Sequence, residues 1–364
     1  MQRCSRCLLP ETYPRISFNK DGICNFCSTF TGFVAPPEKV LINYLKKAKS
    51  KKKPYDVLVP FSGGKDSSYV LYLAKKVHGL NVLAYTLDNG FFTDTALGNI
   101  KSALETLNVD HIFIKPDWHI LKRLYRGVLM RTGELCAVCS IGILVNALKI
   151  SEERRIPLIL DGSSAMESNS GSPERISDLN RFKAILKDIE DVSTKEKEEF
   201  MIYNNLSPIR LLTYSKIGKF GKTVSPLHFL PRVTEDEMSN TLKKEVSWKE
   251  DTLFSQQKKH FDCLAEPFTN YIREKRFGYS RRVCQYSNLI RLGELTREEA
   301  QRRLSEEVPE IEPDTTDLVL EKLELSRDEF NQILKLPLSE YNKYCYQTPK
   351  LLKFIYNIFS KQAQ

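Results

Sequence analysis

The sequence lacks any hydrophobic run long enough to cross a membrane. Its apolar stretches, such as the one that ends at Ile159 and Leu160, fall well short of the ~18 residues that a membrane span needs. The first residues, Met1 to Cys4, contain no apolar segment of the kind found in secretory signals. We therefore expect a soluble, cytoplasmic protein without a membrane span.

Internal repeats, low-complexity tracts and extreme composition are absent as well. With 41% hydrophobic and 28% charged residues among 364, the chain is typical of a globular protein and has room for two or three domains. The net charge of +9, from 55 Lys and Arg against 46 Asp and Glu, is compatible with a nucleotide or a nucleic acid as ligand. Mild basicity alone does not choose between them.

Cysteine, in contrast, is frequent, and six of the nine cysteines form pairs with the spacing Cys-x-x-Cys. The pairs are Cys4 with Cys7, Cys24 with Cys27, and Cys136 with Cys139. An odd number of thiols without a secretion signal argues against a disulfide framework. Paired thiols two residues apart indicate metal or redox chemistry instead.

The first two pairs have the spacing of a zinc ribbon, Cys4-x2-Cys7-x16-Cys24-x2-Cys27. A segment of this size cannot bury enough apolar surface to fold alone, so a bound metal would supply its stability. Four thiolate ligands leave no open coordination position. We therefore expect a structural zinc ion there and no catalysis.

The third pair, Cys136 and Cys139, leaves three interpretations open. The two thiols can be core residues, a redox pair or half of a metal site. His260 and Cys263 repeat the two-residue spacing further along the chain. We therefore hypothesise a second metal site made of Cys136, Cys139 and Cys263, with His260 as an optional further ligand.

The pattern of hydrophobic residues divides the chain into three parts. Strand patterns at 56–61, 81–87, 111–114 and 156–160 alternate with helix patterns at 67–76, 95–107 and 140–153. This alternation predicts an α/β fold with a parallel sheet covered by helices on both faces. From about residue 235 onward the pattern is mostly helical. We assign residues 1–35 to the zinc ribbon, 36–235 to a nucleotide-binding domain and 236–364 to a helical domain.

The most informative motif is the segment 62–68, Ser-Gly-Gly-Lys-Asp-Ser-Ser, between the first predicted strand and its helix. We call it the phosphate loop. Its glycines allow a tight turn and close approach to a ligand, and the N–H groups of the following helix attract anions. Lys65 supplies a mobile cation. The spacing of a Walker A loop is absent.

The phosphate loop resembles the PP-loop of the ATP pyrophosphatase superfamily, whose members cleave ATP to AMP and pyrophosphate. This resemblance implies ATP and Mg²⁺ as ligands, with Lys65, Asp66 and Ser67 in catalysis. It implies nucleotide contacts from the loop and from two strand ends: Ser62, Gly63, Gly64, Lys65, Asp66, Ser67, Ser68, Thr86, Asp88 and Gly162. Asp88 can equally be a turn residue.

The whole chain resembles the N-acetyl sugar amidotransferase family of surface-polysaccharide biosynthesis. The similarity covers 4–12, 18–27, the phosphate loop and 133–139, and its most specific parts are 276–282 and 290–300. The family carries Trp-Pro where this chain has Ala137 and Val138, and Gly-Glu-Asn where it has 161–163. Glu167 lies close to an acidic position of the family.

The resemblance implies a two-step reaction on a nucleotide- or lipid-linked N-acetyl sugar in LPS or O-antigen biosynthesis. ATP adenylates the acetamido oxygen, and ammonia then displaces AMP to leave an acetamidino group. Residue 2 is Gln rather than the Cys of one glutaminase class, and no cysteine lies in a Gly-x-Cys-x-Gly turn. We therefore expect a separate glutaminase as the partner that supplies ammonia.

Two other functions remain open. A tRNA 2-thiolation enzyme would also combine cysteine pairs with a PP-loop, and would hold an iron–sulfur cluster at the third pair and a further cysteine. The segment 161–166 differs from the Gly-His-Asn-Ala-Asp-Asp type of those enzymes, so we do not expect nucleic acid as a partner. A zinc-ribbon binding protein with a degenerate nucleotide fold is disfavoured by the intact loop.

Overall fold

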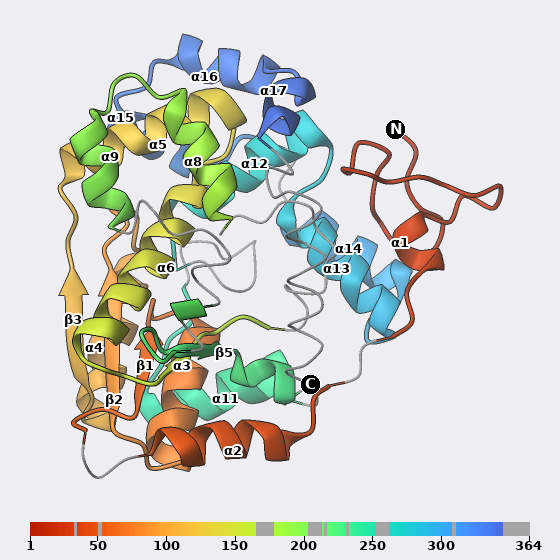
Figure 1. Cartoon of the computed structure of the whole chain (residues 1–364). Coiled ribbons are helices and arrows are strands. Elements are labelled where there is room, and N and C mark those ends of the chain that lie inside the picture. Colours follow the sequence, from red (N-terminus) through yellow and green to blue (C-terminus); the bar gives the residue numbers. More distant parts are fainter. Residues whose placement is uncertain are drawn as a thin grey trace.

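The computed structural model describes residues 1–32, 35–49, 53–164, 178–202, 213–214, 217–230, 233–251, 262–307 and 311–344. Figure 1 shows a sheet with helices on both faces, a group of C-terminal helices beyond one face, and the N-terminal segment beside those helices. Among the described residues, no helix combines the length and the apolar character that a membrane crossing requires.

The centre of the fold is one parallel sheet in the order β3-β2-β1-β4-β5. Its strands are β1 (Val57–Pro60), β2 (Val82–Leu87), β3 (Asp110–Ile114), β4 (Leu158–Leu160) and β5 (Lys222–Val224). All residues of β2 and β4 are buried, as expected of a parallel sheet between two helical layers. The strand order reverses between β1 and β4, and ligands bind at such a switch point. The predicted α/β class is confirmed, whereas β5 is a strand that the sequence pattern does not reveal.

Helices cover both faces of this sheet (Figure 1). One face and its core belong to α2 (Glu38–Ala48), α3 (Lys65–Tyr72), α4 (Asp94–Leu107) and α11 (Glu235–Val246). The other face belongs to α5 (Trp118–Thr132), α6 (Cys136–Glu153), α8 (Leu179–Lys187) and α9 (Thr194–Met201). Helix α11 packs on α3, although it follows the boundary that we place at residue 235. That boundary stays a prediction.

The C-terminal region is mostly helical, as the sequence predicts. It contains α12 (Ala265–Phe277), α13 (Arg281–Leu292), α14 (Arg297–Glu307), α15 (Thr315–Leu323), α16 (Arg327–Lys335) and α17 (Leu338–Lys343). Ser326 and Glu329 form a capping box at the start of α16. Helices α12, α15 and α16 extend the core on the side of α5. The N-terminal segment, with the short helix α1 (Asn25–Ser28), packs instead against α13.

A buried carboxylate joins the sheet domain to the C-terminal helices. Glu134, just before α6, is fully buried, and its Oε1 lies 2.8 Å from Arg281 Nη2 on α13. Arg273 on α12 and Arg181 on α8 lie 3.6 and 3.8 Å from the same carboxylate. Burial raises the pKa of Glu134, but the charges of these arginines outweigh it and bring the pKa to about 2. Glu134 is therefore ionised and shared by three guanidinium groups.

Replacing this carboxylate should destabilise the fold strongly. Removal of one partner from a buried ion pair costs about 3–5 kcal/mol because the remaining charge is uncompensated. We expect Glu134→Gln to lower the free energy of unfolding, measured by urea denaturation at pH 7, by that amount. The exposed Glu298 on α14 provides the control Glu298→Gln, which should change it by less than ~0.5 kcal/mol. A loss below ~1 kcal/mol for Glu134→Gln would contradict the assigned role.

The low pKa of Glu134 predicts that its contribution to the free energy of unfolding depends on pH. Because the pKa of Glu134 is about 2 in the folded protein against 4.5 ordinarily, its stabilisation is complete above pH 4.5 and is lost as pH falls towards 2. The difference in unfolding free energy between wild type and Glu134→Gln should therefore stay constant from pH 7 to 5 and shrink in stronger acid. A difference that is independent of pH down to 3 would argue that another property of the variant is responsible.

Candidate nucleotide site and cysteine clusters

The two glycines of the phosphate loop are needed for different reasons. Gly63 has φ +77°, and a Cβ there would lie 2.4 Å from the carbonyl oxygen of Ala96, so both backbone conformation and space require glycine. Gly64 precedes α3 with an ordinary φ of −70°. A Cβ on Gly64 would instead lie 2.8 Å from Asp262 Oδ2. Its missing side chain therefore leaves room for a group from the C-terminal region.

The loop is closed by its own hydroxyl groups. Ser62 N donates to Ser67 Oγ at 3.2 Å, and Gly64 N donates to Ser62 Oγ at 3.3 Å. The two hydroxyls lie 3.1 Å apart. The Ser68 hydroxyl is buried and has no hydrogen-bond partner among the described residues. Backbone N–H groups and hydroxyls at the start of a helix are the groups that bind phosphate, so the loop fits the predicted ligand.

Lys65 is held in ion pairs rather than extended from the loop. Its Nζ lies 3.3 Å from Asp66 Oδ1 and 3.2 Å from Glu235 Oε1, and only 2% of its side chain is exposed. Glu235 is the first residue of α11, far from the loop in sequence. Sequence reasoning missed Glu235, because no local pattern links it to Lys65.

A second contact from the same region fixes the loop backbone. Trp248 Nε1 donates to the carbonyl oxygen of Gly63 at 2.9 Å, and Asn99 Nδ2 donates to it at 3.3 Å. Asn99 in turn accepts a hydrogen bond from Lys249 N at 2.8 Å. The segment after α11 therefore holds the loop in place. In the sequence, the one feature that could have indicated this contact is Trp248, one of only two tryptophans.

The predicted residues at the strand ends differ in their surroundings. Gly162 adjoins the loop, since a Cβ there would lie 3.1 Å from Ser67 N. Thr86 is buried, donates to Phe61 O at 2.6 Å and lies 2.8 Å from His111 Nε2. Asp88 accepts a hydrogen bond from Gly90 N, which is the turn role that we left open. Glu167 lies outside the described residues.

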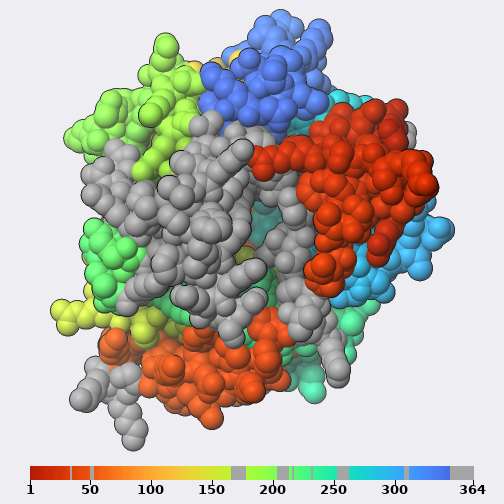
Figure 2. All heavy atoms as spheres, turned by 45° about the vertical axis from the view of Figure 1, so that its right-hand side comes forward, coloured from red at the N-terminus to blue at the C-terminus, as the bar shows by residue number. Residues whose placement is uncertain are grey.

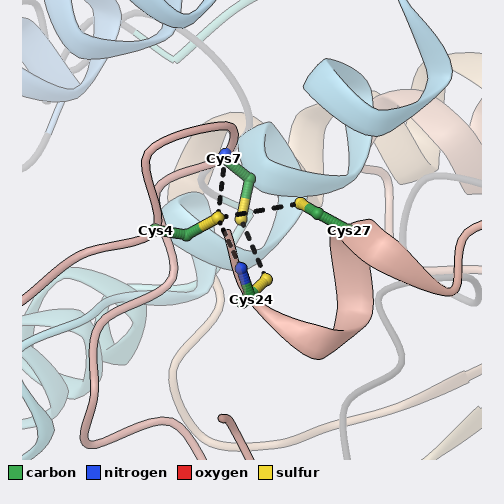
Figure 3. Close-up of side chains that lie close together, drawn as sticks. All are labelled: Cys4, Cys7, Cys24 and Cys27. Atoms are coloured by element: carbon green, nitrogen blue, oxygen red, sulfur yellow. Dashed lines mark hydrogen bonds between the residues drawn. The ribbon is translucent and has the colours of Figure 1, made fainter. Parts of the chain in front are cut away.

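The four N-terminal cysteines form a compact buried cluster (Figure 3). Their sulfur atoms all lie within 4.8 Å of one another, with Cys4 and Cys27 3.9 Å apart and Cys7 and Cys24 3.8 Å apart. Tetrahedral coordination with metal–sulfur bonds of about 2.3 Å places ligand sulfurs about 3.8 Å apart. The cluster therefore fits one tetrahedral ion and is too small to enclose several iron atoms.

The backbone around this cluster also suits a metal bound by thiolates. Cys24 N and Cys7 N donate to Cys4 Sγ at 3.2 and 3.4 Å. Hydrogen bonds from Cys24 and Cys27 lower the pKa of Cys7 to about 7, whereas hydrogen bonding with Cys24 and Cys4 raises the pKa of Cys27. The four thiols therefore do not all ionise without a metal. The positive charge of a bound dication would stabilise them as thiolates.

The ribbon docks on the C-terminal helices and forms a lobe beside them (Figures 1 and 2). Arg297 donates to the carbonyl oxygen of Cys4 at 2.6 Å and to that of Cys7. Leu8 N donates to Ser287 Oγ at 3.1 Å. The specific motifs 276–282 and 290–300 thus lie on α12–α14, the part of the chain that carries the ribbon.

The hypothesised second site has three thiols. Cys136 and Cys139 lie in the first turn of α6, and Cys263 lies two residues before α12. Cys139 Sγ lies 2.9 Å from Tyr125 Oη, and Cys263 Sγ lies 3.8 Å from Asn89 Nδ2. Burial raises the pKa of Cys139 to about 12, and the neighbouring Cys136 contributes to this increase. Within the described residues, only the N-terminal cysteines bring three or more ligand atoms as close as 4.8 Å. The second site stays a hypothesis, and His260 lies outside the described residues.

Metal content distinguishes the two cysteine groups. We expect Cys7→Ser to remove one equivalent of metal, measured by plasma mass spectrometry on protein purified without oxygen, and to expose α13 and α14 to proteolysis because the ribbon packs on them. Cys263→Ser is the test of the second site. If it leaves the total bound metal unchanged, the hypothesis of a second metal is wrong, while a loss of metal confined to this variant supports it.

Comparison with known proteins identifies the C-terminal part of the chain. Residues 252–359 match the family described as LPS biosynthesis protein WbpG-like, C-terminal domain. An uncharacterized protein of Methanocaldococcus jannaschii is 24% identical over 312 residues, which cover 83% of this chain and 92% of that protein. The glutamine-hydrolyzing GMP synthase of Pyrobaculum aerophilum is 32% identical over 88 residues, which cover 24% of this chain and 17% of the enzyme.

Among solved structures, the chain matches the U34-tRNA thiolase NcsA from Methanococcus maripaludis with its [4Fe-4S] cluster. The alignment covers 87% of this chain and 91% of that chain, with 17% identity and a TM-score of 0.33. The matched residues 252–359 include α12–α17. These helices contact the ribbon and carry Arg273 and Arg281, which pair with Glu134. Residues 252–359 therefore carry a domain similar to the C-terminal domain of WbpG-like LPS biosynthesis proteins, which agrees with the surface-polysaccharide family that the motifs resemble.

Proposed function

We propose that the protein is an ATP-dependent amidotransferase that converts the acetamido group of an activated N-acetyl sugar into an acetamidino group. One observation carries this proposal: a phosphate loop at the switch point of a parallel sheet is joined to a WbpG-like domain of LPS biosynthesis. The loop supports ATP as the substrate that activates oxygen. The domain supports a surface sugar, nucleotide- or lipid-linked, as the acceptor.

The reaction would proceed in two displacements. The acetamido oxygen forms a bond to the α-phosphorus as the bond to the pyrophosphate oxygen breaks. Ammonia then adds to the imidate carbon and loses a proton, and the carbon–oxygen bond breaks to release AMP. The N–H groups and hydroxyls around Gly64 and Ser67 would stabilise the charge on the departing pyrophosphate. Mg²⁺ would neutralise part of the same charge when bound with ATP.

The ammonia would come from a separate glutaminase. None of the nine cysteines of the chain lies in a nucleophile turn of the glutaminase type. The similarity to a GMP synthase whose name records glutamine hydrolysis supports chemistry that uses ammonia, although the 88 matched residues are only 17% of that enzyme. The structural ion in the ribbon would be zinc, since four thiolates at tetrahedral spacing suit it.

A tRNA thiolation enzyme is the second candidate function. Cys136, Cys139 and Cys263 pack against the same core, and burial together with the charges of Cys139 and Cys136 raises the pKa of Cys263. Their proximity favours an iron–sulfur cluster, which is held by thiolates. The segment 161–166, however, differs from the Gly-His-Asn-Ala-Asp-Asp type of the thiolation enzymes. We therefore rank this function below the amidotransferase.

A direct assay separates the two functions. Protein purified without oxygen is incubated with ATP and either nucleotide-linked N-acetyl sugars and ammonium, or unmodified tRNA and sulfide. We expect sugar-dependent AMP and pyrophosphate, and a decrease in sugar mass of about one unit as oxygen is replaced by NH. Turnover with tRNA alone, together with iron and labile sulfide, would overturn the proposal in favour of thiolation.

A pair of glycine variants tests whether the phosphate loop performs the ATP chemistry. Gly63→Ala places a Cβ 2.4 Å from the backbone carbonyl oxygen of Ala96 at a φ of +77°. The loop must change its shape to accept it, so we expect pyrophosphate release to fall at least about 100-fold. Gly98→Ala on α4 meets nothing within 4 Å and should retain full activity with equal or higher stability. Unchanged turnover in Gly63→Ala would place the ATP chemistry elsewhere.

A further inference from the structure

Helix α12 carries a row of polar side chains where the C-terminal helices meet the sheet domain. Glu266, Asn270 and Glu274 follow one another at intervals of four residues and therefore share a face of this helix. Arg281, the first residue of α13, belongs to the same layer, because its charge acts on Glu266 and its guanidinium pairs with Glu134. Figure 1 shows α12 and α13 between the sheet domain and the N-terminal segment. We call Glu266, Asn270, Glu274 and Arg281 the α12 polar face.

Three buried atoms of the α12 polar face have no hydrogen-bond partner among the described residues. Asn270 is only 5% exposed and donates a hydrogen bond to Glu266, so its nitrogen is used and its Oδ1 accepts nothing. Glu274 accepts a hydrogen bond from Ser280 N, but no donor reaches its Oε2. The Nε of Arg281 has no acceptor. Folded proteins pair nearly all of their buried polar atoms, so this layer calls for a bound partner.

A ligand can reach the α12 polar face, and the face begins beside the phosphate loop. Glu266 and Glu274 are partly exposed, as is 28% of the Arg281 side chain. Asp262 lies one turn before Glu266, and a Cβ on Gly64 would be 2.8 Å from its Oδ2. From Glu266 to Glu274 the face extends about 12 Å along the helix. Water satisfies single buried atoms of this kind, whereas a row of this length fits an elongated ligand.

The unpaired atoms define the chemistry of that ligand. Asn270 Oδ1 and Glu274 Oε2 are acceptors and require O–H or N–H groups, while Arg281 Nε is a donor and requires an oxygen. The phosphates of a nucleotide bound at the loop offer acceptors only, so they cannot serve all three atoms. A sugar that carries hydroxyl groups and an acetamido group offers donors and acceptors together.

We propose that the α12 polar face binds the acceptor sugar. Hydroxyl or acetamido N–H groups of the sugar donate to Asn270 and Glu274, and an oxygen of the sugar accepts from Arg281. The inference rests on the proposed function and adds that the WbpG-like domain holds the acceptor, with α12 leading from the phosphate loop along the bound sugar. Asn270 is a specificity-determining residue in this arrangement.

The test is the variant Asn270→Leu, which keeps a similar volume and removes the accepting oxygen. AMP formation is measured with full-length protein, ATP, ammonium, and nucleotide- and lipid-linked N-acetylhexosamines. We expect the KM for the sugar to rise at least about tenfold and the KM for ATP to stay unchanged, because a buried hydrogen bond to the sugar alone is lost. The midpoint of urea denaturation should stay equal or increase, since a buried acceptor without a partner is replaced by an apolar group.

A second variant and a matched control complete the experiment. Glu274→Gln keeps the shape of the side chain and replaces one accepting oxygen by an amide group, so the KM for the sugar should rise while the KM for ATP does not. Asn331→Leu makes the same replacement as Asn270→Leu at an exposed position of α16. It should leave both KM values unchanged.

The other outcomes overturn the inference in different ways. A rise in both KM values together with a lower urea midpoint in Asn270→Leu and Glu274→Gln would mean that the α12 polar face only supports packing. An unchanged KM for the sugar in both variants would mean that ordered water satisfies these oxygens. If wild type forms no AMP with any N-acetyl sugar, the proposed function itself fails, and the inference fails with it.

Discussion

The buried carboxylate of Glu134 is the interaction on which the arrangement of the other parts depends. Glu134 lies just before α6, and its ionised carboxylate pairs with arginines on α8, α12 and α13. The neighbouring Gly133 is needed for the same junction, because a Cβ there would overlap Arg276, which donates to the carbonyl oxygen of Thr132. A buried guanidinium group left without its carboxylate partner would be an uncompensated charge, which is strongly destabilising. The sheet domain and the C-terminal helices are therefore fixed to one another by charge as well as by apolar contact.

The conformation of the phosphate loop depends on residues far along the chain. Its glycines and hydroxyls are local features, and they determine that an anion can bind. The orientation of the loop is determined elsewhere, because Trp248 holds the carbonyl of Gly63 and Glu235 holds Lys65. Both groups lie in or just after α11, which packs on α3 through its apolar face. These contacts fix the loop backbone without a ligand, and such preorganisation reduces the entropy lost on binding.

The sequence predicts those parts of the structure that arise from periodicity and short spacing. Alternating strands and helices predict the parallel sheet, and the spacing of the four N-terminal cysteines predicts a compact cluster that the structure confirms. Strand β5 has two exposed residues among its three, so it lacks the apolar run that reveals the equally short β4. Thr86 lies near the predicted strand end, but its hydroxyl is taken by Phe61 and His111. Asp262 and Glu235 could not be identified, because their roles come from contacts between segments about 170 to 200 residues apart, where no local pattern exists.

A series of contacts links the ribbon to the phosphate loop, although none of the hydrogen bonds and ion pairs given above for the described residues joins a ribbon residue to the loop itself. The carbonyl groups of Cys4 and Cys7 hold Arg297 at the start of α14. Helix α13, beside it, begins at Arg281, which binds Glu134. Helix α12 begins directly after the residues that place Asp262 at Gly64. Each step is a helix or a hydrogen-bonded junction, so a metal bound by the four cysteines would stabilise the same scaffold that brings a carboxylate to the phosphate loop. Such an ion would act on the loop through packing alone.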